Sequence, residues 1–106
     1  MASKSSAKLT LEDGRQAARM TALSILATLQ AELGDLDRIA RIIKVFGMVN
    51  VAPGFNQTPA VIDGCSDVLV EIFGDAGRHT RSAVGLAELP FDIAVEIELT
   101  ARLRTQ

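Results

Sequence analysis

The residues best suited to chemistry stand in the last quarter of the chain, where an arginine and two glutamates occur in strand-like segments. Arg81 opens this part of the sequence, and Glu96 and Glu98 follow a turn formed by Pro90-Phe91-Asp92. A guanidinium can bind both oxygens of a carboxylate through its planar set of N–H donors, and a glutamate can orient a water molecule or transfer a proton. The segment therefore predicts either a site for a small carboxylate or a polar interface between subunits.

The segments on either side of this turn must position these side chains, and both read as strands. Beyond the turn, apolar and polar residues alternate, which is typical of a strand with one buried face. The apolar face consists of Ile93, Val95, Ile97, Leu99, Ala101 and Leu103. The polar face consists of Glu96, Glu98, Thr100, Arg102 and Arg104.

Side-chain size predicts how the two strands pair. We expect a hairpin in which Ala87 faces Glu96, because a one-residue slip would place large apolar residues beside the glutamates. In this hairpin Arg81 and Ala83 share with both glutamates the face turned away from the helices. Arg81 and Glu96 then lie about 20 Å apart along the sheet. One small ligand cannot reach both within one chain, so a neighbouring subunit would have to complete the site.

The first half of the chain predicts a long helix. Thr10 and Asp13 form a capping-box pattern at its start, and Gly34 is the expected end. Apolar residues at spacings of three and four form one stripe along it. They are Ala18, Ala22, Ile25, Leu26, Leu29 and Leu33.

A strand and a second helix follow. The β-branched segment 38–51 predicts a long strand that bends near Gly47. The next helix is expected to have Thr58 as its N-cap and Pro59 as its first residue, and to end at Gly74. The order is then helix, strand, helix, strand, strand. It predicts one α+β domain over residues 1–106, with two helices on one face of a sheet and a frayed segment at residues 1–8.

The composition narrows the classes of function. Of the 106 residues, 48% are hydrophobic and 23% charged, with a net charge of −2 and no Trp or Tyr. Nucleic-acid binders usually carry a basic face or aromatic platforms, so we expect no nucleic-acid partner. A single cysteine suits a reducing compartment, and neither a signal peptide nor an apolar run of membrane-spanning length is present, which predicts a cytoplasmic protein without a membrane partner. The apolar content favours self-association.

Several other polar residues have simpler interpretations than a site. Cys65 lies on the apolar stripe of the second helix and is expected to be a small core residue. His79, the only histidine, stands in a polar loop and is expected to be solvated. The short basic cluster of Arg38, Arg41 and Lys44 is expected to be a solvated strand face.

The chain resembles the YjgF/Rid family, the reactive intermediate deaminases. The most specific part of the resemblance is Arg81-Ser-Ala-Val84, Ala87-Glu-Leu-Pro90 and Val95-Glu-Ile-Glu98. It extends back through Lys44-Val-Phe-Gly-Met-Val-Asn50, Ala52-Pro-Gly-Phe55 and Val70-Glu-Ile-Phe-Gly74 to Leu9-Thr-Leu-Glu-Asp-Gly14.

The resemblance implies a chorismate-mutase-like fold, assembled as a homotrimer with clefts between subunits. It implies hydrolysis of reactive enamines and imines, such as 2-aminoacrylate, to keto acids and ammonia, with no metal or organic cofactor. By position, Arg81 matches the arginine that binds the substrate carboxylate, and Glu96 the glutamate that positions the attacking water. Ala83 stands where many members have a cysteine whose backbone contacts the ligand.

The chain also departs from the family pattern. Members usually begin with two further strands, which carry a tyrosine near the ligand, and no segment here matches that N-terminal β-hairpin or supplies a tyrosine. A non-catalytic trimeric protein that binds small carboxylates such as keto acids, or regulates through them, therefore stays open as an alternative. An RNA-cleaving translation inhibitor is a third and less favoured one.

Overall fold

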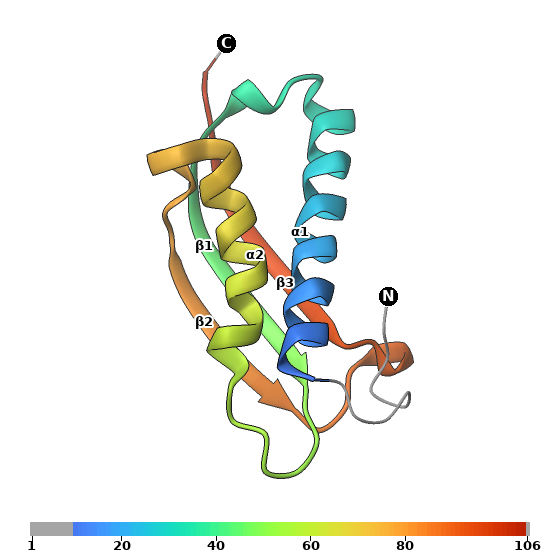
Figure 1. Ribbon diagram of the computed structural model, residues 1–106. Helices are drawn as coiled ribbons and strands as arrows, with labels where there is room; N and C mark the ends of the chain where they lie inside the picture. Colours follow the sequence, from blue (N-terminus) through green and yellow to red (C-terminus); the bar gives the residue numbers. More distant parts are fainter. Residues whose placement is uncertain (1–9, 106) are drawn as a thin grey trace.

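A computed structural model describes residues 10–105, so the expected fraying of residues 1–8 lies outside the described part of the chain. Two helices, α1 (Leu11–Leu33) and α2 (Thr58–Phe73), lie against a sheet of three strands (Figure 1). The strands are β1 (Ile39–Asn50), β2 (Thr80–Leu86) and β3 (Val95–Leu103). Three short 3-10 turns connect them: η2 (Leu36–Arg38), η3 (Gly74–Gly77) and η4 (Pro90–Asp92). The predicted α+β class and element order are confirmed.

Helix α1 has the ends that the sequence predicts. The Thr10 hydroxyl accepts a hydrogen bond from the Asp13 amide (3.0 Å), and the Thr10 amide donates to the Asp13 carboxylate (3.1 Å). Gly34 ends the helix with a φ of 85°, a left-handed conformation that glycine adopts without a steric penalty. Of the predicted stripe, Ala18, Ala22 and Leu26 are fully buried. The helix is thus fixed by its capping box and its apolar stripe.

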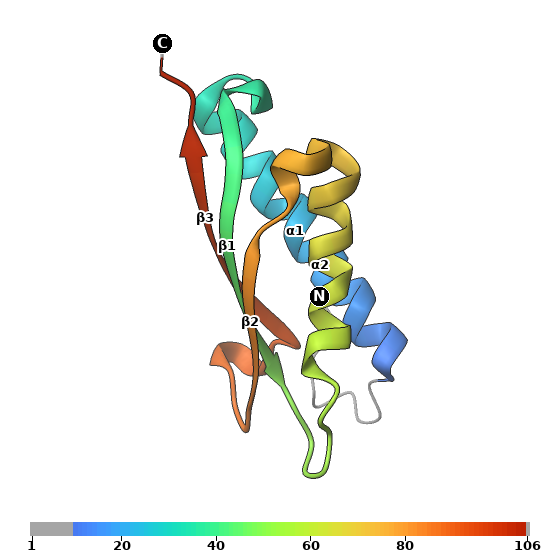
Figure 2. The same cartoon turned by 90° about the vertical axis from the view of Figure 1, so that its left-hand side faces the viewer.

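Helix α2 runs in the same general direction as α1, crosses it obliquely and is in close contact with it, on the same side of the sheet (Figures 1 and 2). Gly64 makes this approach possible, because a Cβ atom there would overlap the backbone carbonyl of Arg15. The predicted N-cap is wrong by one residue. Gln57 is the cap, and the Thr58 hydroxyl instead donates to the carbonyl of Ala83 in β2 (3.3 Å). Gly74 ends the helix, as predicted.

Strand β1 is the centre of the sheet, whose order is β2-β1-β3. It pairs with β2 in parallel and with β3 antiparallel. The irregularities of β1 lie near its start, where the pairing with β3 shifts between Ile39 and Arg41 and between Ile42 and Lys44. Gly47 has a packing role, since a Cβ there would overlap the Ile62 side chain of α2.

The predicted hairpin is wrong, because β1 lies between β2 and β3. The turn at residues 90–92 forms where expected, but the connection 87–94 crosses one end of the sheet to reach its other edge (Figure 2). Asn50 holds this connection. Its side-chain amide donates to Asp92 Oδ1 (2.9 Å) and to the Ile93 carbonyl (3.0 Å), and its backbone amide donates to the Ala94 carbonyl (2.8 Å).

The sheet has one face under the helices and one open face. Aligned residues of neighbouring strands point to the same side, so the register identifies both faces. The helix-facing rows are Arg81–Val45–Leu99, Ala83–Gly47–Ile97 and Gly85–Val49–Val95. The open-face rows are Ser82–Phe46–Glu98 and Val84–Met48–Glu96. The alternation predicted for β3 is confirmed. The face predicted for Arg81 and Ala83 is wrong, because they lie on the helix-facing side and Glu96 and Glu98 on the open side.

Candidate functional site

Arg81 lies on the helix-facing side of the sheet, not on the open side that the hairpin predicted. It is level with Val45 in the neighbouring strand, whose side chain is fully buried under the helices. This side of β2 can face the helices because Ala83 and Gly85, the next residues of the strand on it, are small. A Cβ on Gly85 would lie 3.1 Å from Val51 and 3.3 Å from Thr58, at the start of α2. Small side chains in β2 thus make room for α2 rather than for a ligand on the open face.

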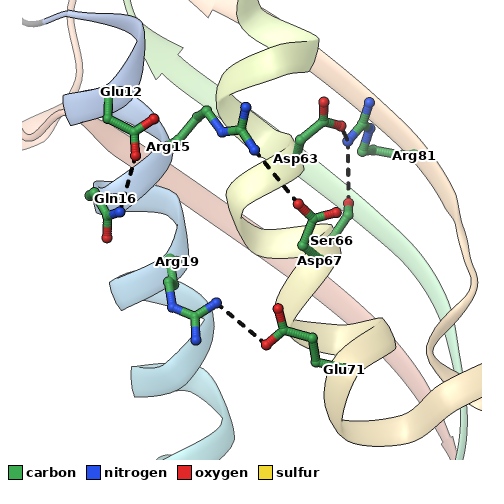
Figure 3. Close-up of polar contacts among 9 residues, drawn as sticks. All are labelled: Glu12, Arg15, Gln16, Arg19, Asp63, Ser66, Asp67, Glu71 and Arg81. Atoms are coloured by element: carbon green, nitrogen blue, oxygen red, sulfur yellow. Dashed lines mark hydrogen bonds and ion pairs between the residues drawn. The ribbon is translucent and has the colours of Figure 1, made fainter.

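Two residues of α2 hold the Arg81 guanidinium (Figure 3). Its Nη1 atom donates to Asp63 Oδ1 at 2.6 Å and to the Ser66 hydroxyl at 3.2 Å. No other hydrogen bond described for residues 10–105 involves this guanidinium. The side chain of Arg81 is 25% exposed and that of Asp63 46% exposed. Arg81 therefore has a fixed orientation and keeps N–H donors for a further acceptor.

His79 extends this contact set, and the prediction of a solvated loop histidine is wrong. Its Nδ1 lies 2.6 Å from the Gly77 carbonyl, which can only accept, so Nδ1 carries a proton. In the neutral ring, Nε2 then accepts from the Ser66 hydroxyl at 2.9 Å. Ser66 in turn accepts from Arg81. One connected network thus joins Asp63, Arg81, Ser66 and His79.

The spacing in α2 explains how the network forms. Residues three apart in a helix lie on one side, so Asp63 and Ser66 both face β2. The next carboxylate of α2, Asp67, lies toward α1 and pairs with Arg15 at 3.7 Å (Figure 3). The spacing of Asp63 and Ser66 is visible in the sequence, but the partner strand is not, which is why sequence reasoning missed this network.

Cys65 is fully buried between the helices and the sheet, as predicted for a core residue. Burial raises the pKa of its thiol from 9.0 to about 11, and the nearby positive charge of Arg81 opposes this rise in part. At neutral pH the group is a protonated thiol, which is a poor nucleophile. It is a packing residue beside the network.

Glu96 lies on the open face of β3, in the row of Met48 and Val84. Glu98 is on the same face and is exposed. From Arg81, the Glu96 position is two strands away across the sheet, about 10 Å, and three residues along it, about 10 Å more. The predicted separation of 20 Å along a hairpin is wrong. The two side chains are nevertheless kept apart within one chain, because they point to opposite sides of the sheet.

Ala83 lies on the helix-facing side, and its side chain packs against the core. Its carbonyl accepts the hydrogen bond from Thr58. The structure therefore brings Ala83 close to Arg81 on one strand and does not bring either residue to Glu96 in the same chain. Ala83 supports the position of α2 over the strand that carries Arg81.

An open hollow of about 330 Å³ lies near the start of β2. It is lined by Arg41, Ile43, Arg78, His79 and Thr80. Arg41 is exposed, in agreement with a solvated basic strand face, but it shares this hollow with a second arginine and the histidine of the network. Among residues 10–105, no three His, Cys, Asp or Glu side chains are grouped as metal ligands would be. None of the helices in that range is both long and apolar enough to span a membrane.

Known proteins are similar to this chain in sequence and in fold. Protein TCP17 of Trypanosoma cruzi is 45% identical over 98 residues, which cover 92% of this chain and 61% of that protein. The crystal structure of Atu1372, a protein of unknown function from Agrobacterium tumefaciens, matches with a TM-score of 0.89 and 38% identity, over 94% of this chain and 64% of that one. A protein of Shewanella oneidensis described as a putative endoribonuclease matches with a TM-score of 0.87 and 36% identity, over 92% and 64%.

The chain thus spans less than two thirds of the length of these relatives. The family described as "YjgF/chorismate mutase-like, putative endoribonuclease" matches residues 2–103, nearly the whole sequence. The part of the Atu1372 structure that this chain matches has the fold observed here, two helices on a mixed three-stranded sheet. On both sequence and structure, the chain belongs to the YjgF/chorismate mutase-like family.

Proposed function

We propose that this chain forms an enamine/imine deaminase that acts on small carboxylates such as 2-aminoacrylate. The observation that carries the proposal is the state of Arg81. Its guanidinium is held by Asp63 and Ser66 through one nitrogen, is three-quarters buried, and keeps donors for a ligand carboxylate. A partly buried arginine binds a carboxylate more strongly than an exposed one, because water and salt screen the attraction less.

Glu96 is proposed to act from a neighbouring subunit. Within one chain it faces away from Arg81, so a shared site requires a second copy. The open face carries partly exposed apolar side chains, among them Leu86 with 38% exposure, and β2 and β3 are both edge strands of the sheet. Such a face favours association with further copies. A homotrimer with one cleft at each interface is the assembly proposed.

The reaction then needs only a substrate held in position, the carboxylate of a glutamate and a water molecule. Arg81 holds the carboxylate of the protonated imine, and Glu96 orients a water molecule that adds to the neighbouring carbon. The resulting carbinolamine expels ammonia. The overall balance is one iminium carboxylate and one water giving one keto acid and one ammonium ion. No step of this hydrolysis calls for a metal or an organic cofactor.

The test is turnover of 2-aminoacrylate generated in the assay by an amino-acid dehydratase, with keto acid formation followed over time. Arg81→Ala should lower kcat/KM about 10- to 100-fold, as expected for loss of a charged hydrogen bond. Glu96→Gln should lower kcat, and Glu98→Gln, the matched change on the same strand face, should leave it unchanged. Unaltered protein that binds keto acids without any turnover would instead identify a non-catalytic carboxylate-binding protein.

Mixed assemblies test whether the site lies between subunits. Arg81→Ala and Glu96→Gln chains would be unfolded together and refolded in equal amounts. In a ring of like interfaces, about a quarter of the sites should then carry both intact residues and regain activity. A mixture as inactive as its two components would exclude a site shared between chains.

RNA cleavage is a second candidate, favoured by one observation. The hollow beside His79 gathers Arg41 and Arg78, and arginines are suited to bind phosphate. If this candidate holds, binding of a single-stranded RNA should weaken steeply with salt and be lost in Arg41→Gln/Arg78→Gln. The same double variant should leave keto acid formation intact if the deaminase is correct.

A further inference from the structure

Asp63 places a carboxylate directly beside the guanidinium that is proposed to bind the ligand. The two charged atoms, Asp63 Oδ1 and Arg81 Nη1, are 2.6 Å apart. Asp63 Oδ2 receives no hydrogen bond from any residue described between 10 and 105, and nearly half of the side chain is exposed. A ligand that reaches Arg81 therefore also meets a free carboxylate oxygen.

This arrangement is unfavourable for a ligand that carries only a carboxylate. Asp63 already satisfies part of the Arg81 charge, and it repels a second carboxylate placed next to it. Asp63 instead attracts a ligand that also carries a cationic nitrogen one bond from the carboxylate-bearing carbon. Its carboxylate can face the free donors of Arg81 while its N–H group donates to Asp63 Oδ2, so that opposite charges alternate.

We propose that Asp63 is a second ligand-binding residue of the Arg81 site and receives a cationic nitrogen. The site then takes α-amino and protonated α-imino carboxylates in preference to α-keto acids. This inference rests on the proposed function only in taking Arg81 as the carboxylate-binding residue. It deepens that function because it names the residue that recognises the charge of the protonated imine, which the neutral enamine lacks, and it explains how the keto acid product is released.

The test compares alanine with pyruvate, which share a carbon skeleton and differ in the nitrogen. Isothermal titration calorimetry on the full chain at neutral pH should show that alanine binds more tightly than pyruvate. Asp63→Asn keeps an oxygen acceptor for Arg81 but removes the charge. It should weaken alanine binding about tenfold and leave pyruvate binding unchanged or stronger.

Asp67→Asn is the matched control, because Asp67 stands one turn further along α2 and pairs with Arg15 instead. It should bind both ligands as the unaltered protein does. Equal affinity of the unaltered protein for alanine and pyruvate would overturn the inference, whether or not Asp63→Asn folds well. So would an equal loss of both ligands in Asp63→Asn, which would make Asp63 a residue that only positions Arg81.

If the proposed function itself is wrong, the binding measurements should give a different result. If neither ligand binds, or if Arg81→Ala binds both as well as the unaltered protein does, Arg81 is not a carboxylate site and both proposals fall. If Arg81→Ala loses both ligands and Asp63→Asn does not change the preference, only the role of Asp63 is excluded.

Discussion

Helix α2 makes arginine–carboxylate contacts on both of its flanks, and the two flanks differ in what surrounds the charges. Toward α1, Arg15 pairs with Asp67 at 3.7 Å and Arg19 with Glu71 at 3.5 Å. These four side chains are 41–61% exposed. Long contacts between exposed groups contribute little, because water screens the attraction and ordering the side chains costs entropy.

Toward β2, the same kinds of residue form a shorter and better supported contact. Arg81 and Asp63 are 2.6 Å apart, and Arg81 is 25% exposed. Ser66 also accepts from Arg81 and is itself oriented by His79. The comparison shows that residue type does not separate a structural surface pair from a candidate site. Burial and a second layer of hydrogen bonds do.

The largest effect is expected where the two helices touch. Gly64→Ala would place a methyl group against the Arg15 backbone carbonyl, which cannot move without shifting α1. We expect a loss of about 3 kcal/mol in the free energy of unfolding, measured by urea denaturation. The double variant Arg15→Gln/Arg19→Gln should lose less than about 1 kcal/mol. If the double variant were the less stable one, the α1 flank would depend on its ion pairs after all.

A smaller effect is expected from Cys65, which is buried beside the Arg81 flank. Its folded-state pKa of about 11 lies above its ordinary value of 9.0, so the folded state holds the thiol proton more tightly. The resulting stabilisation is fully present below pH 9 and is lost as the pH rises through 11. Unaltered protein should therefore lose about 2 kcal/mol more than Cys65→Ala between pH 8 and pH 11. Parallel stability curves for the two proteins would show that the thiol titrates normally.

The smallest effect is expected in the coupling free energies of the two ion pairs, which compare the two flanks directly. Double-mutant cycles with alanine should give a coupling of about 1–2 kcal/mol for Arg81 and Asp63. The coupling for Arg15 and Asp67 should stay below about 0.5 kcal/mol. Thermal and urea denaturation of the single and double variants measure both values. Equal couplings would remove the distinction between the flanks and weaken the assignment of Arg81 to a site.

Much of the local structure could be predicted from the sequence, because local interactions decide it. The capping box at Thr10 and the stop at Gly34 depend on residues within one helical turn, and both are confirmed. The alternation in β3 gave the correct buried face. The N-cap of α2 was misplaced, because the Thr58 hydroxyl donates to Ala83 of β2 and does not cap its own helix. The irregularity of β1 was also misplaced, since it lies near Ile39–Lys44 and not near Gly47.

The strand order could not be predicted from local interactions, although two features of the sequence indicate that β1 is a central strand. The connection 87–94 is longer than the two to five residues usual for a hairpin, and β1 is apolar along much of its length, as central strands are. Pairing by side-chain size instead put Arg81 on the wrong face. The small residue Gly85 instead leaves room for Thr58 at the start of α2.

The sequence by itself determined the helices, the strands and the family, and with them the residue types available for chemistry. It did so because capping, periodicity and turn chemistry are local. Only the tertiary structure decided that β1 separates β2 from β3, that Arg81 faces Asp63 and Ser66, and that Glu96 points to the opposite side of the sheet. These contacts join residues 15 or more positions apart, and packing between whole elements selects them.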